Sequence, residues 1–291
     1  MVIRSYLHPE KWYRTAKYIG LGSGPFSREY PEMHRNRFAE VMIVSYPKSG
    51  RSWLRMIISA YVAALHGKPL DHQEDITDLR HQISDIPHIV FVHDGSTYAQ
   101  PINVPSEELN ADKTAFETKK VVLLVRDPRD VLVSYYFHCT HRQKVFEGTL
   151  SDFIRDDRFG IRKLITFLNH WNNAQKIPAS FTLLRYEDMS SDTYHEMVRL
   201  INILGLPLKE EALTQAIAFS AFDNMKKRER SGELYIKGRF GAGETKDEQS
   251  YKVRQGKVGG YKDALQPDDI KYLNDQINNF LSPFFGYHTK D

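Results

Sequence analysis

The chain has 291 residues, of which 41% are hydrophobic and 26% charged, and its formal net charge is +3. These values are ordinary for a soluble globular protein, and so small a positive charge does not favour a nucleic-acid-binding protein. No segment has the roughly 18 consecutive apolar residues of a membrane-spanning helix, and the N-terminal sequence does not resemble a secretory signal. Cys139 is the only cysteine, so an internal disulfide bond is excluded, and the Asn-x-Ser/Thr glycosylation signal is absent. Both absences favour a cytoplasmic protein.

Apolar strand-like segments alternate with helical segments along the chain. Continuous apolar runs predict strands, and apolar residues repeated every three or four positions predict helices. The expected strands are 41–46, 89–92, 121–125 and 181–184, and the expected helices are 53–65, 128–138, 161–176, 193–204 and 267–281. Continuous apolar strands between helices are typical of a parallel sheet that is covered on both faces. We therefore expect an α/β fold with three layers, α/β/α, around a central, mostly parallel sheet.

One long polar stretch interrupts this alternation. Lys226 to Gly259 is rich in Lys, Arg, Glu and Gly and has almost no apolar periodicity. A loop of this length within a compact domain is usually functional or disordered. We predict a single domain over residues 1–291, with an N-terminal extension at 1–40 and a mobile flap at 226–260.

A short polar turn joins the first expected strand to the first expected helix. Its sequence is Tyr46-Pro-Lys-Ser-Gly-Arg-Ser52. Such a turn directs backbone N–H groups toward an anion, the helix N-terminus adds about half a positive charge, and Lys48 adds a full one. Ser49 and Ser52 can donate hydroxyl hydrogen bonds, and Gly50 lets the backbone approach a ligand closely. The turn therefore indicates a phosphate site, although an ordinary turn with a solvated lysine fits the same residues.

A second polar motif follows the third expected strand. Arg126 comes at the carboxyl end of this strand, and Ser134 comes eight residues later, two turns into the next helix. This is the edge at which open α/β sheets bind ligands, so both side chains can reach one phosphate. Taken singly, Arg126 could instead pair with Asp127 or Asp130, and Ser134 could be a small helix-packing residue.

Both motifs resemble those of sulfotransferases that use 3′-phosphoadenylyl sulfate (PAPS) as donor. The string Y-P-K-S-G-x-[ST]-W-L at residues 46–54 is similar to the 5′-phosphosulfate loop of that family, and Val125 to Tyr136 is similar to its 3′-phosphate motif. The resemblance implies a P-loop-like PAPS-binding loop, PAPS as donor substrate and PAP as product. It also implies that Ser49, Gly50, Arg51 and Ser52 line the 5′-phosphate, and that Arg126 and Ser134 hold the 3′-phosphate.

Further segments extend the resemblance to about residues 41–265. Tyr186-Glu-Asp-Met189 is similar to a family motif whose tyrosine lies near the adenine, and Trp53 stands where the family has a stacking tryptophan. Three further residues are spaced like those of a family segment that contributes adenine contacts. They are Ser220, Phe222 and Met225. For the aromatic residues, packing in the core is the competing interpretation.

The last resemblance lies inside the expected flap. Arg254-Gln-Gly-Lys-Val-Gly-Gly-Tyr-Lys262 is similar to the family's terminal motif, in which an arginine and the following backbone hold the 3′-phosphate. This assigns Arg254, Gln255 and Gly256 to the nucleotide site. Gln255 stands in place of a lysine of that motif, and Gly260-Tyr261 stands in place of Asp-Trp, so the detailed contacts of the flap are in doubt.

A histidine is the expected catalytic base. Sulfuryl transfer requires removal of the acceptor proton, and a neutral imidazole with an ordinary pKa near 6.5 is suited to this step. Of the 12 histidines, His93 directly follows an expected strand and lies where the family's catalytic histidine falls. Its alternative role is to cap a carbonyl at the strand end. Lys48 is expected to stabilise the leaving oxygen as negative charge develops there. We expect no metal.

Two other function classes remain open on the sequence. A P-loop nucleotide-dependent kinase would use a similar turn, but the G-x-x-x-x-G-K frame is missing, and the third strand ends in Arg126 rather than an acidic residue. A non-catalytic PAP- or nucleotide-binding protein of the same fold would bind PAP without sulfating any acceptor. The acceptor itself, whether a phenol, an alcohol or an amine, and the oligomeric state are not readable from the residues. Tyr98, Tyr135, Phe137 and Phe146 suit a flat or apolar acceptor, and they suit core packing equally well.

Overall fold

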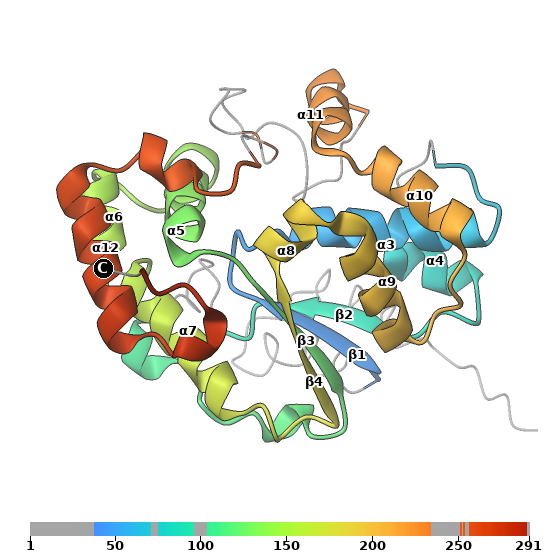
Figure 1. Cartoon of the computed structure of the whole chain (residues 1–291), viewed down its shortest axis with the longest axis horizontal. Coiled ribbons are helices and arrows are strands. Elements are labelled where there is room, and N and C mark those ends of the chain that lie inside the picture. The colour runs from blue at the N-terminus through green and yellow to red at the C-terminus, as the bar shows by residue number, and fades with distance from the viewer. Residues whose placement is uncertain are drawn as a thin grey trace, which may run out of the picture.

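The computed structural model describes residues 38–70, 75–95, 104–233, 251, 253 and 256–289. At its centre lies a sheet whose four described strands are β1 (Val41–Ser45), β2 (Ile89–Val92), β3 (Lys120–Val125) and β4 (Ser180–Arg185). The strand order is β2-β1-β3-β4, and every described pair is parallel. The mostly parallel sheet predicted from the sequence is thus confirmed (Figure 1).

The helices include all five that the sequence predicts, each with ends close to the expected residues. In chain order they are α3 (Arg51–Leu65), α4 (Ile76–Gln82), α5 (Pro128–Phe137), α6 (Leu150–Arg155), α7 (Ile161–Asn173), α8 (Tyr186–Ser191), α9 (Thr193–Leu204), α10 (Glu210–Phe219), α11 (Phe222–Ser231) and α12 (Pro267–Phe280). Short 3₁₀ helices occur at η1 (Ser106–Glu108), η2 (Thr114–Phe116), η5 (Gly260–Asp263) and η6 (Pro283–Phe285), and a π-helical turn, η3 (His138–Arg142), follows α5.

Alternating strand residues divide the core into two halves. Val41 and Ile43 face a cluster formed with α3, α4, α9 and α10. Met42 and Val44 face a second cluster formed with α5, α6, α7 and α12. Because a strand places successive side chains on opposite faces, a continuous apolar strand serves both clusters. The result is the expected three-layer α/β/α arrangement, with the two groups of helices on opposite sides of the sheet (Figure 1).

The local signals for helix ends act as expected. Asp127 caps α5 by accepting a hydrogen bond from the Arg129 N–H, and Pro128 occupies the first turn. Gly205 ends α9 in the left-handed conformation, with φ of 74°.

The first residues of the expected flap at 226–260 are helical. Residues 226–231 continue α11, because Met225 and Glu229 lie one turn apart and are both buried. Residues 234–250, 252, 254 and 255 of this flap, and residues 1–37 of the expected N-terminal extension, lie outside the described residues. Among the described helices, none is long and apolar enough to cross a membrane.

Candidate active site

Each of the four described strands delivers one of the predicted site segments at its carboxyl end. The 46–52 turn follows β1, His93 follows β2, Arg126 follows β3 and Tyr186 follows β4. Since all these strands are parallel, their carboxyl ends meet at the same edge of the sheet. Segments that are far apart in the sequence are thereby gathered at the edge where open α/β sheets bind ligands.

The turn after β1 has the backbone of an anion-binding loop. Lys48 has a φ of 73° and Gly50 a φ of 99°, and Gly50 is the N-cap of α3 without a side-chain capping bond. The described first turn of α3 holds no acidic residue, so its N–H groups and the helix dipole face no carboxylate from this turn. Ser49 is 2% exposed, while Arg51 and Ser52, which begin α3, are partly exposed.

Tyr186 connects three of the predicted motifs. A Cβ atom on Gly50 would lie 2.5 Å from its ring, and the guanidinium carbon of Arg126 lies 4.3 Å from the ring centroid. The Tyr186 hydroxyl donates a hydrogen bond to the Gly256 carbonyl at 3.0 Å. Burial raises the pKa of this phenol above its ordinary value, so the hydroxyl keeps its proton and acts as donor. The 5′ loop, the 3′ motif and the terminal motif therefore meet at one side chain.

The residues predicted to contact adenine also lie together. The Trp53 ring is 5.5 Å from the Tyr186 ring in an edge-on arrangement, and its Nε1 donates to the Ser220 carbonyl at 3.1 Å. Trp53 and Phe222 pack against a small buried cluster that contains Met225. Gly256 approaches the same wall, since a Cβ atom there would lie 2.5 Å from the Phe222 ring.

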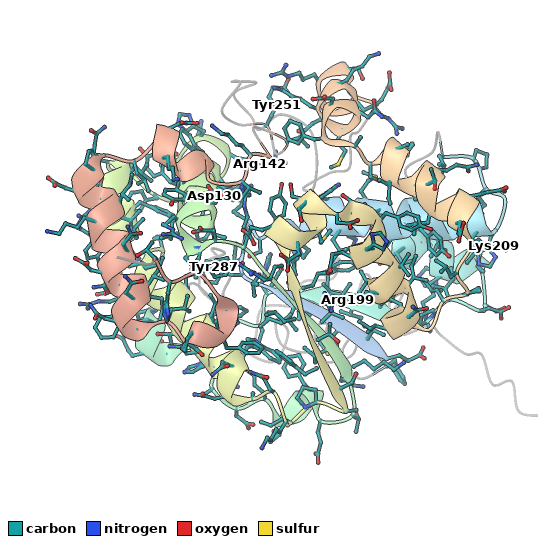
Figure 2. The ribbon with its side chains drawn as sticks, viewed as in Figure 1. Asp130, Arg142, Arg199, Lys209, Tyr251 and Tyr287 are labelled. Atoms are coloured by element: carbon teal, nitrogen blue, oxygen red, sulfur yellow. The ribbon has the colours of Figure 1, made fainter. Side chains whose placement is uncertain are left out.

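On the 3′ side, Arg126 and Asp130 contact the backbone of the terminal motif. Arg126 donates to the Lys257 carbonyl at 2.9 Å and lies 3.5 Å from the Asp130 carboxylate. Asp130 accepts hydrogen bonds from the N–H groups of Gly259 at 2.8 Å and Tyr261 at 2.9 Å. Asp130 lies on α5, between α12 and the sheet in the view of Figure 2. The ion pair weighed for Arg126 from the sequence does form, together with a loop contact that the sequence did not reveal.

Ser134 lies two turns into α5 and is partly buried, as the motif predicts. Arg254 and Gln255 lie outside the described residues, so their predicted contacts stay predictions.

His93 is held against the end of β1. Its Nδ1 lies 2.7 Å from the Ser45 carbonyl oxygen, directly before the 46–52 turn. A carbonyl oxygen can only accept, so Nδ1 carries the proton, and Nε2 is the basic nitrogen of the neutral ring. The capping contact that was the alternative role of His93 is thus present, and in the neutral ring it leaves Nε2 as the unprotonated nitrogen.

The residue after His93 is anchored independently. Asp94, with φ of 46°, accepts a hydrogen bond from the Trp171 Nε1 at 3.0 Å and lies 2.9 Å from the ammonium group of Lys113. Lys113 is itself 1% exposed. These contacts hold the strongly turned backbone in which His93 stands.

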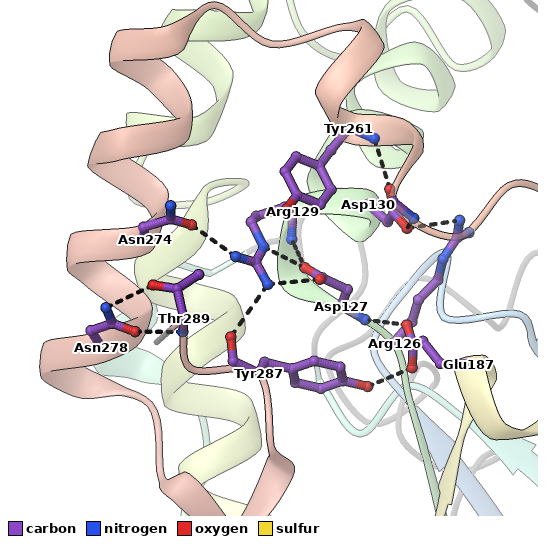
Figure 3. Close-up of polar contacts among 11 residues, drawn as sticks. Arg126, Asp127, Arg129, Asp130, Glu187, Tyr261, Asn274, Asn278, Tyr287 and Thr289 are labelled. Atoms are coloured by element: carbon purple, nitrogen blue, oxygen red, sulfur yellow. Dashed lines mark hydrogen bonds and ion pairs between the residues drawn. The ribbon is translucent and has the colours of Figure 1, made fainter. Parts of the chain in front are cut away.

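A network behind the site joins the C-terminal residues to α5 and α8 (Figure 3). Arg129 bonds Asp127 through two nitrogens, and it also donates to the Asn274 side chain and the Tyr287 carbonyl. Glu187 accepts from the Asp127 N–H at 2.8 Å and from the Tyr287 hydroxyl at 2.9 Å. Burial, with Glu187 beside it, raises the pKa of Tyr287 well above its ordinary value. The network fixes the end of β3 relative to the start of α8.

The sequence interpretation missed the contacts that acidic residues of the site make with distant segments. Asp130, Glu187 and Asp94 bond backbone or side-chain groups from segments that are distant in the sequence. The available signal was position: Asp130 lies one helical turn after Arg126, and Glu187 and Asp94 directly follow predicted site residues. Position alone does not show which group a carboxylate accepts from.

Several buried polar atoms near this edge of the sheet have no hydrogen-bond partner among the described residues. They include the Ser220 hydroxyl and the Arg126 Nε, as well as side-chain atoms of Ser45, Tyr46 and Arg185. Buried polar groups are nearly always paired, so unpaired ones such as the Ser220 hydroxyl and the Arg126 Nε are consistent with a ligand that supplies the partner. Within the same described ranges, no group of His, Cys, Asp or Glu is arranged to hold a metal ion.

Comparison with known proteins agrees with the family resemblance seen in the sequence. The model of the sulfotransferase domain family matches residues 39–284. Mouse sulfotransferase 2B1 is 30% identical over 225 residues, which cover 74% of this chain and 65% of the mouse protein, slightly under two thirds of its length. Cytosolic sulfotransferase 14 of Arabidopsis thaliana is 24% identical over 274 residues, covering 84% of this chain and 75% of that protein.

The fold has solved counterparts. The crystal structure of the mouse sulfotransferase SULT7A1 complexed with PAP has a TM-score of 0.59 to this chain at 16% identity, covering 86% of this chain and 89% of that one. Because the family model matches most of the chain and the sheet edge assembles the segments that carry the motifs, the protein belongs to the sulfotransferase family.

Proposed function

We propose that the protein transfers a sulfuryl group from PAPS to a hydroxyl or amine of a small-molecule acceptor and releases PAP. Family membership supports sulfuryl transfer. The observation that carries the donor assignment is the meeting of the 5′ loop, the 3′ motif and the terminal motif at Tyr186. A nucleotide with a phosphate at each end of its ribose fits this arrangement, because each motif offers donors to one phosphate.

The 5′ side would bind the phosphosulfate. The N–H groups at the start of α3, Lys48 and the hydroxyls of Ser49 and Ser52 supply the donors. The 3′ side would bind the phosphate that distinguishes PAPS from other adenine nucleotides, through Arg126, Ser134 and Arg254. The unpaired Arg126 Nε fits this role, and the unpaired Ser220 hydroxyl fits a contact with the base.

The chemistry would use two residues at the ends of adjacent strands. His93 takes the acceptor proton on Nε2, because its Nδ1 proton is committed to the Ser45 carbonyl. As the S–O bond to the nucleotide breaks, the oxygen left on the 5′-phosphate gains negative charge, and the Lys48 ammonium stabilises it. The bond from the acceptor oxygen or nitrogen to sulfur forms on the opposite side, so the displacement is in line.

The acceptor would be small and partly apolar. Phe137 and Phe146 are partly buried near α5, whereas Tyr135 is fully buried in the core and contacts Tyr46 and Phe153. Tyr135 is therefore a packing residue, and Tyr98 lies outside the described residues. A cytosolic location is proposed with the same function, in line with the Arabidopsis relative named cytosolic.

The test is turnover of PAPS against a panel of phenols, aliphatic alcohols, amines and sugars. His93→Ala is expected to lower kcat by about 10²- to 10⁴-fold, the usual contribution of a general base. His195→Ala is the matched control, because His195 is an exposed histidine on α9 paired with Asp192.

Three results would count against the proposal. Near-normal turnover of His93→Ala would remove the proposed base. PAP binding without sulfation of any acceptor would favour the non-catalytic protein. Magnesium-dependent transfer of phosphate from ATP would favour the kinase.

A further inference from the structure

Asp130 does more than form a surface ion pair: it also accepts hydrogen bonds from a distant segment of the chain. It is 4% exposed, and its two carboxylate oxygens accept from two different backbone N–H groups, those of Gly259 and Tyr261. Both partners lie about 130 residues further along the chain. Hydrogen bonds to an ionised carboxylate are roughly twice as strong as neutral ones. A buried carboxylate that accepts two hydrogen bonds therefore holds the segment that contains Gly259 and Tyr261 in place.

Arg126, four residues before Asp130, contacts the same segment. It donates to the Lys257 carbonyl at 2.9 Å, while Tyr186 donates to the Gly256 carbonyl at 3.0 Å. The backbone from Gly256 to Tyr261 is thus tied at four points to residues that follow β3 and β4. Gly259 has a φ of 73°, and this left-handed turn brings the N–H groups of Gly259 and Tyr261 onto one carboxylate. We call these four hydrogen bonds the clamp. Because of the clamp, the backbone of the terminal motif lies against Arg126.

The negative charge of Asp130 would by itself oppose phosphate binding. Its carboxylate lies 3.5 Å from Arg126, so it competes with a phosphate for the same guanidinium. If charge were the dominant effect, neutralising Asp130 would strengthen the binding of a phosphate at Arg126. If the ordering of residues 256–261 dominates, neutralising Asp130 weakens it. The two effects have opposite signs, which makes the role of Asp130 measurable.

We propose that Asp130 is a positioning residue that selects nucleotides carrying a 3′-phosphate, by fixing the 256–261 backbone beside Arg126. The proposal rests on the proposed function. The carboxylate does not touch the nucleotide. It acts through the backbone that it holds, and its effect is therefore confined to ligands that reach the 3′ side of the site.

The test compares two ligands that differ only in the 3′-phosphate. Binding of PAP and of 5′-AMP is measured by calorimetry for the wild-type protein, for Asp130→Asn and for Asp269→Asn. Asparagine keeps the size of the side chain, but it removes the charge and one of the two acceptors. The Asp269 variant is the matched control, because Asp269 is also a buried, ion-paired carboxylate, but among the described residues it bonds Arg155 and Ser151 and not residues 256–261.

Asp130→Asn is expected to weaken PAP binding by about 10-fold or more, from the loss of charge-assisted hydrogen bonds. Affinity for 5′-AMP is expected to stay within about twofold, so the ratio of the two affinities falls. Asp130→Glu, which keeps both acceptors, should recover part of the ratio. Asp269→Asn should leave the ratio as it is in the wild-type protein.

Each other outcome has a defined meaning. Tighter PAP binding by Asp130→Asn, or an equal loss for PAP and 5′-AMP, would overturn the positioning role. Failure of the wild-type protein to bind PAP would instead overturn the proposed function. If Asp130→Asn does not fold, amide hydrogen exchange of the nucleotide-free wild-type protein decides. Slow exchange at Gly259 and Tyr261 supports the clamp, and exchange at the rate of an unbonded amide contradicts it.

Discussion

The two proposed phosphate-binding sides of the site are built in different ways. The 5′ side is one contiguous turn, residues 46–52, shaped by its own backbone and by the start of α3. The 3′ side is assembled from the ends of β3 and β4 and from residues 256–261, and side-chain hydrogen bonds are among the contacts that hold these segments together. A contiguous turn forms with the strand and helix that flank it, whereas an assembled site depends on each of its separate contacts.

This difference suggests that the two sides contribute to different kinetic parameters. In the proposed function Lys48 on the 5′ side acts at the bond that breaks, so we expect changes there to act mainly on kcat. The proposed 3′-phosphate contacts do not act at that bond, so we expect changes there to act mainly on nucleotide affinity. Binding energy from a remote group that is equal in the ground and transition states lowers KM without raising kcat.

The largest effect is expected from Lys48→Met. Loss of the positive charge at the leaving oxygen should lower kcat by about 10²- to 10³-fold, the usual cost of removing one such stabilising donor. PAP affinity should fall less. Steady-state kinetics with varied PAPS concentration separate the two parameters. A variant that changes only the KM for PAPS would break the proposed division between the sides.

The second largest effect is expected from Arg126→Lys. Lysine keeps the charge, but it loses the planar donor set and the stacking on Tyr186, which lies 4.3 Å away. The KM for PAPS should rise by about 10- to 100-fold, the range expected for a hydrogen bond between charged groups, with kcat changed much less. A fall in kcat as large as that of Lys48→Met would show that the two sides do not act separately.

Gly50→Ala tests whether the 5′ turn depends on its glycine. Its φ of 99° is strained for alanine, and the added Cβ would lie 2.5 Å from Tyr186. We expect a loss of at least about 1–2 kcal/mol in the free energy of unfolding, together with weaker PAP binding. Gly67→Ala is the control, because Gly67 lies just past the other end of α3 with φ of 65° and nothing within 4 Å of the added atom. Equal losses in both variants would show that the contact with Tyr186 adds nothing.

The smallest effect is expected from Trp53→Phe. Phenylalanine keeps an aromatic ring beside Tyr186, but it loses the hydrogen bond to the Ser220 carbonyl. Thermal or denaturant unfolding should show a loss of about 1 kcal/mol, with a change of only a few-fold in PAP affinity. Trp171→Phe, which removes an indole hydrogen bond to Asp94 on the opposite face of the sheet, should lower stability without changing PAP affinity. A larger effect of Trp53→Phe on PAP than on stability would identify direct stacking on the adenine.

The sequence predicted those features that depend on neighbouring residues. Strands β1 to β4 follow from continuous apolar runs, and Asp127-Pro128 marks the start of α5. The site segments followed because each comes directly after such a strand. Helices α4, α6, α8, α10 and α11 were not predicted. Two of these have only six residues, which is too short for a reliable apolar period.

Contacts between distant segments could not be predicted. Nothing in the local sequence of Asp130 indicates that it binds the N–H groups of Gly259 and Tyr261. The buried position of Glu229 was also missed, because charged neighbours on α11 make the segment resemble a solvated loop. Its carboxylate accepts from the Val253 N–H at 2.8 Å. Such pairings depend on the complete fold.

The bonds of Tyr287 have a consequence for the way the chain tolerates processing. Its hydroxyl bonds Glu187, the residue after Tyr186, and its carbonyl bonds Arg129, three residues after Arg126. Tyr186 and Arg126 belong to the proposed nucleotide site. Proteolytic cleavage directly before Tyr287 would remove both contacts without touching a proposed catalytic residue. The cleaved protein would then lose nucleotide affinity and stability together, and bound PAP would slow the cleavage if this segment loosens only when the site does.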